Sequence, residues 1–86
     1  MFYIYVLSDK NSDFYTGYTK NLKKRIEEHH GGKVFATKSK LPIKLIYSEA
    51  CLDQTDALKR EKYLKSGPGK KFLRYRNKYY LNNLLK

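Results

Sequence analysis

The fold of this protein is decided near its start, where residues 2–7 read FYIYVL. Aromatic and β-branched residues favour a β-strand, and both sets of alternating side chains are apolar, so both faces of this strand are expected to be covered. A polar turn over residues 8–13 leads to a second short strand over residues 14–18. This arrangement predicts a β-hairpin, and Gly17 within it indicates a bulge or a close backbone approach.

Caps, breakers and periodicity predict the elements that follow the hairpin. A helix starts from Thr19 or Asn21 and ends at Gly31-Gly32, and a basic loop follows over residues 33–42. The next strand covers residues 43–48, with Leu45 and Tyr47 on one face and Ile46 on the other. A helix then runs from Asp53 to about Lys65, and a last helix near Pro68 carries Phe72, Tyr75, Tyr79 and Tyr80. The order β-β-α-β-α-α predicts an α+β domain with helices packed on a small sheet.

The composition fits one small domain. The chain has 86 residues, of which 41% are hydrophobic, so it can pack a modest core despite its high charge. We expect a single domain over residues 1–86, with a core over about 2–75 and a basic helix or tail over about 76–86.

Several classes of protein are excluded by residue counts. The single cysteine, Cys51, cannot form an internal disulfide, and we expect no disulfide-linked partner. One cysteine with two histidines is too few for a tetrahedral zinc site. No apolar run approaches the roughly 20 residues that span a bilayer, and the start lacks a basic leader, so the expected compartment is the cytoplasm.

The charge is strongly positive and unevenly placed. Lysine and arginine number 19 against 8 aspartates and glutamates, which gives a net charge of +11. A nucleic acid is the partner expected for such basic clusters interleaved with tyrosines, and a membrane surface is a weaker rival. The residues expected to contact nucleic acid are Gly17, Lys24, Lys38, Lys40, Lys70, Lys71 and Arg74.

Glu61 stands at an unusual place in its predicted helix. Its spacing from Ala57, Leu58 and Leu64 puts it on the apolar side. A carboxylate in such a position needs a metal ion or a cation as partner. A metal ligand and a structural ion pair with Arg60, or with a lysine on another element, both satisfy this spacing.

Arg25 and His29 share one face of the first predicted helix, next to Leu22 and Ile26. A guanidinium suits a phosphate group and an imidazole can pass a proton, but a solvated helix face explains the same spacing. The tyrosines of the hairpin present a similar choice, because tyrosine also packs well in a half-buried sheet.

Taken in order, these residues resemble the motifs of the GIY-YIG family. The motifs are Tyr3-Ile4-Tyr5, then Tyr15-Thr16-Gly17 followed by Arg25 and His29, then ALKREKYLK over residues 57–65. The chain is similar to small stand-alone proteins related to the N-terminal nuclease module of the bacterial excision-repair endonuclease. The resemblance covers about residues 2–75. Tyr3 and Thr16 depart from the glycine and isoleucine that give the motifs their names.

The resemblance implies a three-stranded antiparallel sheet flanked by helices and a metal-dependent phosphodiester hydrolase. It implies that Arg25 stabilises the transition state, that Glu61 binds one Mg²⁺ or Mn²⁺ ion, and that Tyr5 takes a proton from water with His29 as relay. Tyr15 is the second motif tyrosine, and which tyrosine is the base stays open. The catalytic residues expected on this basis are Tyr5, Tyr15, Arg25, His29 and Glu61.

Two hypotheses follow for the function. The first is a cytoplasmic, magnesium-dependent endonuclease that acts on DNA, in repair or recombination. The second is a non-catalytic nucleic-acid-binding module that keeps the fold and the basic surface. They differ in the role of Glu61, which the first requires for cleavage, whereas binding in the second does not depend on it.

Overall fold

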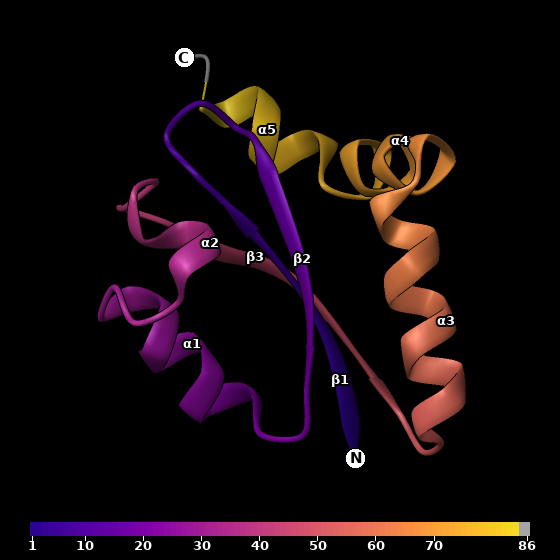
Figure 1. Ribbon diagram of the computed structural model, residues 1–86. Coiled ribbons are helices and arrows are strands. Elements are labelled where there is room, and N and C mark those ends of the chain that lie inside the picture. Colours follow the sequence, from indigo (N-terminus) through magenta and orange to yellow (C-terminus); the bar gives the residue numbers. More distant parts are fainter. Residues whose placement is uncertain (85–86) are drawn as a thin grey trace.

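The hairpin at the start of the chain forms the centre and one edge of a three-stranded antiparallel sheet (Figure 1). The structure is a computed structural model and describes residues 1–84, so the end of the basic tail expected over residues 76–86 lies outside the described residues. The strands and helices are β1 Phe2–Ser8, β2 Phe14–Thr19, α1 Leu22–His30, α2 Phe35–Lys38, β3 Lys44–Cys51, α3 Gln54–Lys65, α4 Gly67–Arg76 and α5 Lys78–Asn83.

The central strand β1 is covered on both faces, as its sequence predicts. The sheet order is β2-β1-β3, with helices α1 and α2 on one side and α3 and α4 on the other (Figure 1). Four consecutive residues of β1, Ile4 to Leu7, are buried. The predicted α+β class and the three-stranded antiparallel sheet are therefore confirmed.

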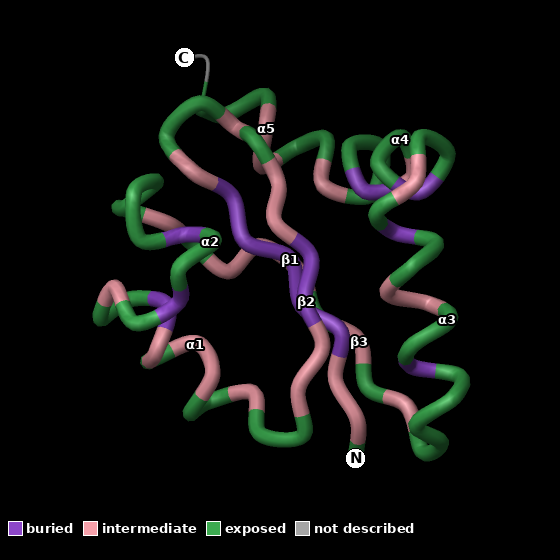
Figure 2. Tube along the Cα trace, in the orientation of Figure 1, coloured by how far each residue is buried: buried purple, intermediate pink, exposed green. Residues whose placement is uncertain are grey.

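The hydrophobic core lies between the sheet and the pair α3 and α4. Ile4 and Val6 of β1 pack there against Ala57, Leu64 and Leu73. Figure 2 shows buried positions along β1 and β2 and on α3 and α4, with a further group where α1 and α2 meet. Leu58, which the sequence placed beside Ala57 and Leu64, is instead 43% exposed. It follows Ala57 directly, and successive residues on a helix do not share a face.

Strand β3 departs from simple alternation. Its pairing with β1 shifts between Val6, which pairs with Tyr47, and Leu7, which pairs with Leu45. Ile46 and Tyr47 are adjacent in the chain, yet both pack against the core. A bulge has this effect because two residues of one strand oppose a single residue of the other. The predicted placement of Tyr47 and Ile46 on opposite faces is therefore wrong. The strand also extends beyond the predicted residues 43–48.

The basic segment over residues 33–42 contains a short helix, α2, where the sequence predicted only a loop. Val34 and Thr37 are buried, and the amides of Thr37 and Lys38 both donate to the Val34 carbonyl. This turn packs beside α1. The sequence did not predict this helix, because the segment is rich in lysine and its two buried residues do not form a helical apolar repeat.

The predicted last helix is two helices. α4 ends at Asn77, whose side chain and backbone amide both donate to the Leu73 carbonyl, and α5 starts at the next residue. An asparagine that bonds its own backbone competes with helix continuation.

The predicted cap Asp53 is confirmed, since its side chain accepts from the Thr55 and Asp56 amides.

The turn between α3 and α4 depends on Gly69. A Cβ atom there would overlap the backbone at Tyr63 and Leu64, so the close approach of the two helices admits only glycine. The Ser66 hydroxyl caps α4 by accepting from the Gly69 amide at 3.2 Å. The break predicted at Gly67-Pro68-Gly69 is therefore a tight helix–helix junction.

The burial difference between two leucines of α3 gives a matched test of the core. We expect Leu64→Ala to lower the free energy of unfolding by about 2–5 kcal/mol, because it removes a fully buried side chain. Leu58→Ala, on the same helix but exposed, should cost less than about 1 kcal/mol. Urea unfolding followed by circular dichroism measures both. Equal costs would contradict the packing described for α3.

Candidate active site

The ring of Tyr5 lies directly across Gly17. The two residues are paired opposite each other in β1 and β2, so their side-chain positions share one face of the sheet. A Cβ atom at Gly17 would overlap the hydroxyl and ring carbons of Tyr5. The sequence offered a bulge or a close approach at this glycine. The structure has the close approach, with a side chain rather than backbone.

A buried chain of hydrogen bonds continues from Tyr5 into the helices. Its hydroxyl lies 2.8 Å from His29 Nε2, and His29 Nδ1 lies 2.7 Å from Thr37 Oγ1. All three side chains are buried. His29 is the only buried residue of α1, whereas Leu22 and Ile26 are half-buried. The solvated-face interpretation of His29 is therefore wrong.

Sequence reasoning missed Thr37. It lies in the basic segment after α1 and matches no helical or strand repeat in its surroundings. In the fold its hydroxyl bonds Nδ1 of His29, the ring nitrogen opposite the one that bonds Tyr5, and so fixes the orientation of the ring. A hydrogen bond to one ring nitrogen sets what the other nitrogen can donate or accept.

Tyr15 completes a cluster of three rings. Its ring centroid lies 6.4 Å from that of Tyr5 and 5.2 Å from that of His29. The Tyr5 and His29 rings meet edge to face at 5.4 Å. Such edge contacts add to the burial energy of aromatic side chains. The structure thus brings Tyr5, Tyr15 and His29 together from two strands and α1.

Arg25 and Glu61 both act on the Tyr5 hydroxyl. Burial raises the pKa of Tyr5, interaction with Arg25 opposes this rise, and the negative charge of Glu61 adds to it. The phenol in turn raises the pKa of Arg25, with a further contribution from Glu28. Tyr5 is therefore an un-ionised phenol near neutral pH, placed within electrostatic reach of one cation from α1 and one carboxylate from α3.

Each of these charged residues also has a local ion pair. Arg25 Nη1 lies 3.2 Å from Glu28 Oε1, and Glu61 Oε2 lies 3.2 Å from Lys65 Nζ. The Glu61 side chain is 19% exposed, so the predicted partial burial holds. The cation that pairs with Glu61 is Lys65 of the same helix, whereas the structural ion pair expected from the sequence was with Arg60 or with a lysine on another element. Arg60 instead forms a bidentate pair with Glu49 of β3.

The donor set available for a metal ion is sparse. Within residues 1–84, no three histidine, cysteine, aspartate or glutamate side chains group closely enough to enclose one. A lone carboxylate such as Glu61 is compatible with Mg²⁺, which keeps several waters and takes oxygen ligands from a substrate phosphate. The site therefore fits a weakly held hard cation and does not fit a structural zinc.

The residues expected to contact nucleic acid fall into separate places. Lys24 lines a hollow of about 360 Å³ at the start of α1, together with Arg25 and Glu28. Lys38 lies at the end of α2 and Lys40 follows it, so both flank the same helix pair. Lys70, Lys71 and Arg74 lie on α4, across the sheet from α1. The Arg74 guanidinium lies over the Phe14 ring at 4.6 Å and donates to the Ser12 carbonyl, so it ties α4 to the hairpin.

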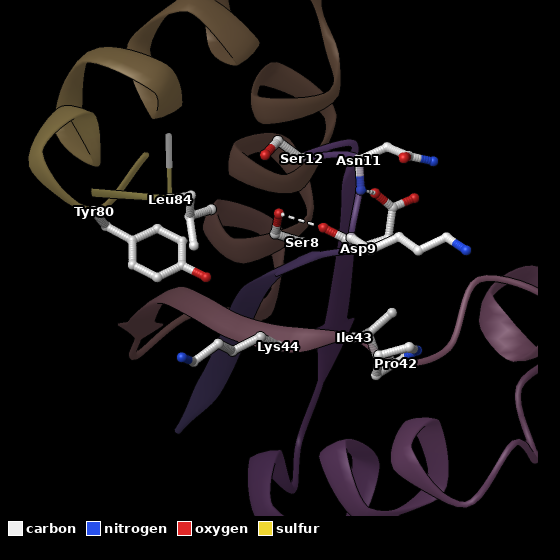
Figure 3. A pocket seen from close by; sticks show the side chains of 10 residues that line it. Ser8, Asp9, Asn11, Ser12, Pro42, Ile43, Lys44, Tyr80 and Leu84 are labelled. Carbon is white, nitrogen blue, oxygen red and sulfur yellow. Dashed lines mark hydrogen bonds between the residues drawn. The ribbon is translucent and has the colours of Figure 1, made fainter. Parts of the chain in front are cut away.

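A larger hollow of about 600 Å³ lies elsewhere (Figure 3). The turn between β1 and β2 forms one wall, and residues 42–44 and Tyr80 form the other. None of the five predicted catalytic residues lines it. Size alone therefore does not identify the chemical site, which is defined by the cluster around Tyr5.

This geometry agrees with the comparison with known proteins. Residues 1–80 match the GIY-YIG catalytic domain, and the chain belongs to the GIY-YIG family, a family of nuclease domains. Within that family it is similar to proteins called UPF0213. It is 42% identical over 65 residues to the UPF0213 protein of Syntrophus aciditrophicus (strain SB), which covers 73% of this chain and 75% of the relative.

Two further relatives support the same grouping. The UPF0213 protein of Bacillus licheniformis is 39% identical over 74 residues, or 85% of this chain and 76% of the relative. The solution NMR structure of the UPF0213 protein of Bacillus halodurans is 32% identical, with a TM-score of 0.54 over 85% of this chain and 82% of that one. The motif resemblance and the fold are therefore confirmed.

None of the helices within residues 1–84 has the length and apolar character needed to cross a bilayer.

The buried His29 predicts a pH-dependent stability. Burial and the charge of Arg25 lower the pKa of His29, and Glu28 partly opposes them. As the pH falls, His29 therefore takes up a proton at a higher pH in the unfolded chain than in the folded protein. The contribution of neutral His29 is complete above about pH 6.5 and is lost as the pH falls towards and through the lower folded-state pKa.

We expect His29→Asn to flatten the fall in unfolding free energy between about pH 7.5 and pH 5, measured by urea titration at each pH. His30→Asn is the control, because this neighbouring histidine is exposed and its charge is the smallest of the influences on the pKa of His29, so the variant should keep most of the wild-type slope. If both variants follow the wild-type curve, His29 is not the group that titrates.

Proposed function

We propose that this protein is a divalent-metal-dependent endonuclease that hydrolyses phosphodiester bonds in DNA. One observation carries the proposal. The buried hydrogen bond of 2.8 Å between the Tyr5 hydroxyl and His29 Nε2 lies next to the Arg25 guanidinium of α1, and the negative charge of Glu61 on α3 adds a smaller influence on the phenol. A cation, a carboxylate and a proton-bearing group at one place are the parts that phosphodiester hydrolysis requires. Membership of a nuclease family supports this assignment.

Arg25 is assigned to the phosphate. Its side chain is 37% exposed and lines the hollow at the start of α1, so it can meet a ligand without leaving its position. Its charge would stabilise the added negative charge on the phosphate oxygens as water attacks. Glu28 holds the guanidinium in place beforehand, which lowers the cost of ordering it.

Tyr5 and His29 are assigned to the proton of the attacking water. The raised pKa of Tyr5 disfavours a phenolate formed in advance. The lowered pKa of His29 keeps its imidazole neutral, so Nε2 can accept the Tyr5 proton while the phenol oxygen takes one from water. Nδ1 would then donate to Thr37, which stabilises the resulting imidazolium. This favours Tyr5 over Tyr15 as the group that meets water.

Glu61 is assigned to one Mg²⁺ or Mn²⁺ ion. When bound, the ion would supply Lewis-acid stabilisation of the phosphate and the departing oxygen. Lys65 neutralises the carboxylate in the absence of the ion, which prevents a partly buried charge from remaining unpaired. The expected settings are the cytoplasm and DNA repair or recombination, and the net charge of +11 suits a polyanionic substrate.

Plasmid nicking tests the proposal. The wild type with Mg²⁺ or Mn²⁺ should convert supercoiled plasmid to the open circle, and excess EDTA should stop the reaction. Arg25→Ala and Glu61→Gln should each reduce the rate by at least about a hundredfold, the scale of losing one electrostatic group. Glu27→Gln is the matched control, because this exposed acid of α1 has no role in the site.

The outcomes separate the two hypotheses. If Glu61→Gln nicks as fast as the wild type, the catalytic assignment is wrong. If wild-type protein binds DNA in a salt-sensitive manner, never cleaves it, and binds equally well with Glu61 replaced, the chain is a binding module that has kept the fold.

A further inference from the structure

Two tyrosines project from the junction of α4 and α5 into solvent. Tyr75 is 71% exposed and Tyr79 is 74% exposed. The Nζ atom of Lys78 lies 4.7 Å from the centroid of the Tyr75 ring and 5.1 Å from that of Tyr79. One ammonium group therefore holds both rings at a single place on the surface. We call these three residues the tyrosine platform.

The other aromatic side chains of α4 and α5 have structural tasks. Phe72 packs against the core and meets the Tyr47 ring edge to face at 6.4 Å. Tyr80 is half-buried, lies under the Lys44 ammonium at 5.5 Å, and lines the hollow in Figure 3. Packing thus accounts for two of the four aromatic residues of the last helical region. The platform rings are not accounted for in this way.

The surroundings of the platform are positively charged. The sequence from Ser66 to Leu84 contains no aspartate or glutamate. Its basic residues are Lys70, Lys71, Arg74, Arg76 and Lys78. An acid-free helical surface attracts polyanions, and duplex DNA could satisfy it through phosphate contacts alone. Exposed ring faces have no use in such contacts, whereas unpaired bases stack on them.

We propose that the tyrosine platform binds a single-stranded segment of the nucleic-acid substrate, with bases stacked on Tyr75 and Tyr79 and the backbone held by Lys78 and its basic neighbours. The inference rests on the proposed function only in taking nucleic acid as the substrate. It adds a substrate class, namely DNA with unpaired nucleotides. Because stacking reads no hydrogen-bonding edge, the platform tolerates any base.

Fluorescence anisotropy with labelled 20-nucleotide oligodeoxythymidine and a 20-base-pair duplex tests the proposal. The measurements are made in EDTA, so that they do not depend on cleavage. The double variant Tyr75→Ala/Tyr79→Ala should weaken single-strand binding by about tenfold or more and change duplex binding by less than about threefold. Tyr75→Phe/Tyr79→Phe, which keeps the rings, should bind as the wild type does.

Two controls separate the platform from general effects. Leu52→Ala removes a leucine that is 85% exposed outside the platform, and single-strand binding should persist. Lys59→Ala removes a basic residue of α3, and it should weaken single-strand and duplex binding alike, whereas Lys78→Ala should act more strongly on single strands. Circular dichroism should show unchanged folding, because the replaced side chains are exposed.

Three results would overturn the proposal. They are a wild type that does not bind the single strand, an equal loss of single-strand and duplex binding in the alanine double variant, and tighter platform-dependent binding to phosphatidylglycerol vesicles that oligodeoxythymidine does not displace. Arg25→Ala is measured in parallel. A variant that stops nicking but keeps full platform-dependent binding shows that the two proposals succeed or fail separately.

Discussion

The contact between Tyr5 and Gly17 is the constraint on which the site depends. Because Gly17 has no side chain, the Tyr5 ring can lie across the edge strand and reach both His29 and the charges on α1 and α3. A larger residue at position 17 would turn the phenol away, and the hydrogen bonds that bury His29 would be lost with it. The same contact therefore fixes the Tyr5 hydroxyl against His29 and so ties α1 to the sheet.

The two faces of the sheet have different tasks. The side covered by α3 and α4 is an apolar core in which Ile4 and Val6 pack against residues of both helices. The side covered by α1 and α2 is held by polar contacts through His29 and Thr37. Buried polar networks are costly unless every member is paired, and each buried side-chain donor and acceptor in residues 1–84 has a partner. The buried polar cluster thus lies on one face of the sheet and the apolar cluster on the other, and Glu61 belongs to α3 on the apolar side.

The sequence predicted the order of the three strands, the helices α1 and α3, and the apolar pattern of β1, because these depend on local spacing. It could not predict that α2 would form among lysines or that β3 would bulge at Ile46, since these follow from contacts with other elements. The break at Asn77 rests on a local hydrogen bond to the Leu73 carbonyl, which the apolar pattern of the helix does not show. Motif resemblance placed Arg25 and Glu61 in one site, which spacing alone did not. Thr37 and the exposure of Tyr75 and Tyr79 became visible only in three dimensions.

An anomalous difference map from crystals soaked in Mn²⁺ tests most directly whether Glu61 binds the metal ion. If α1 and α3 build one catalytic site, a manganese peak should lie on the Glu61 carboxylate near the Tyr5 hydroxyl, with Lys65 displaced from its ion pair. A map with no manganese at Glu61, or with manganese only at carboxylates remote from Tyr5, would contradict the claim that α1 and α3 build a single catalytic site.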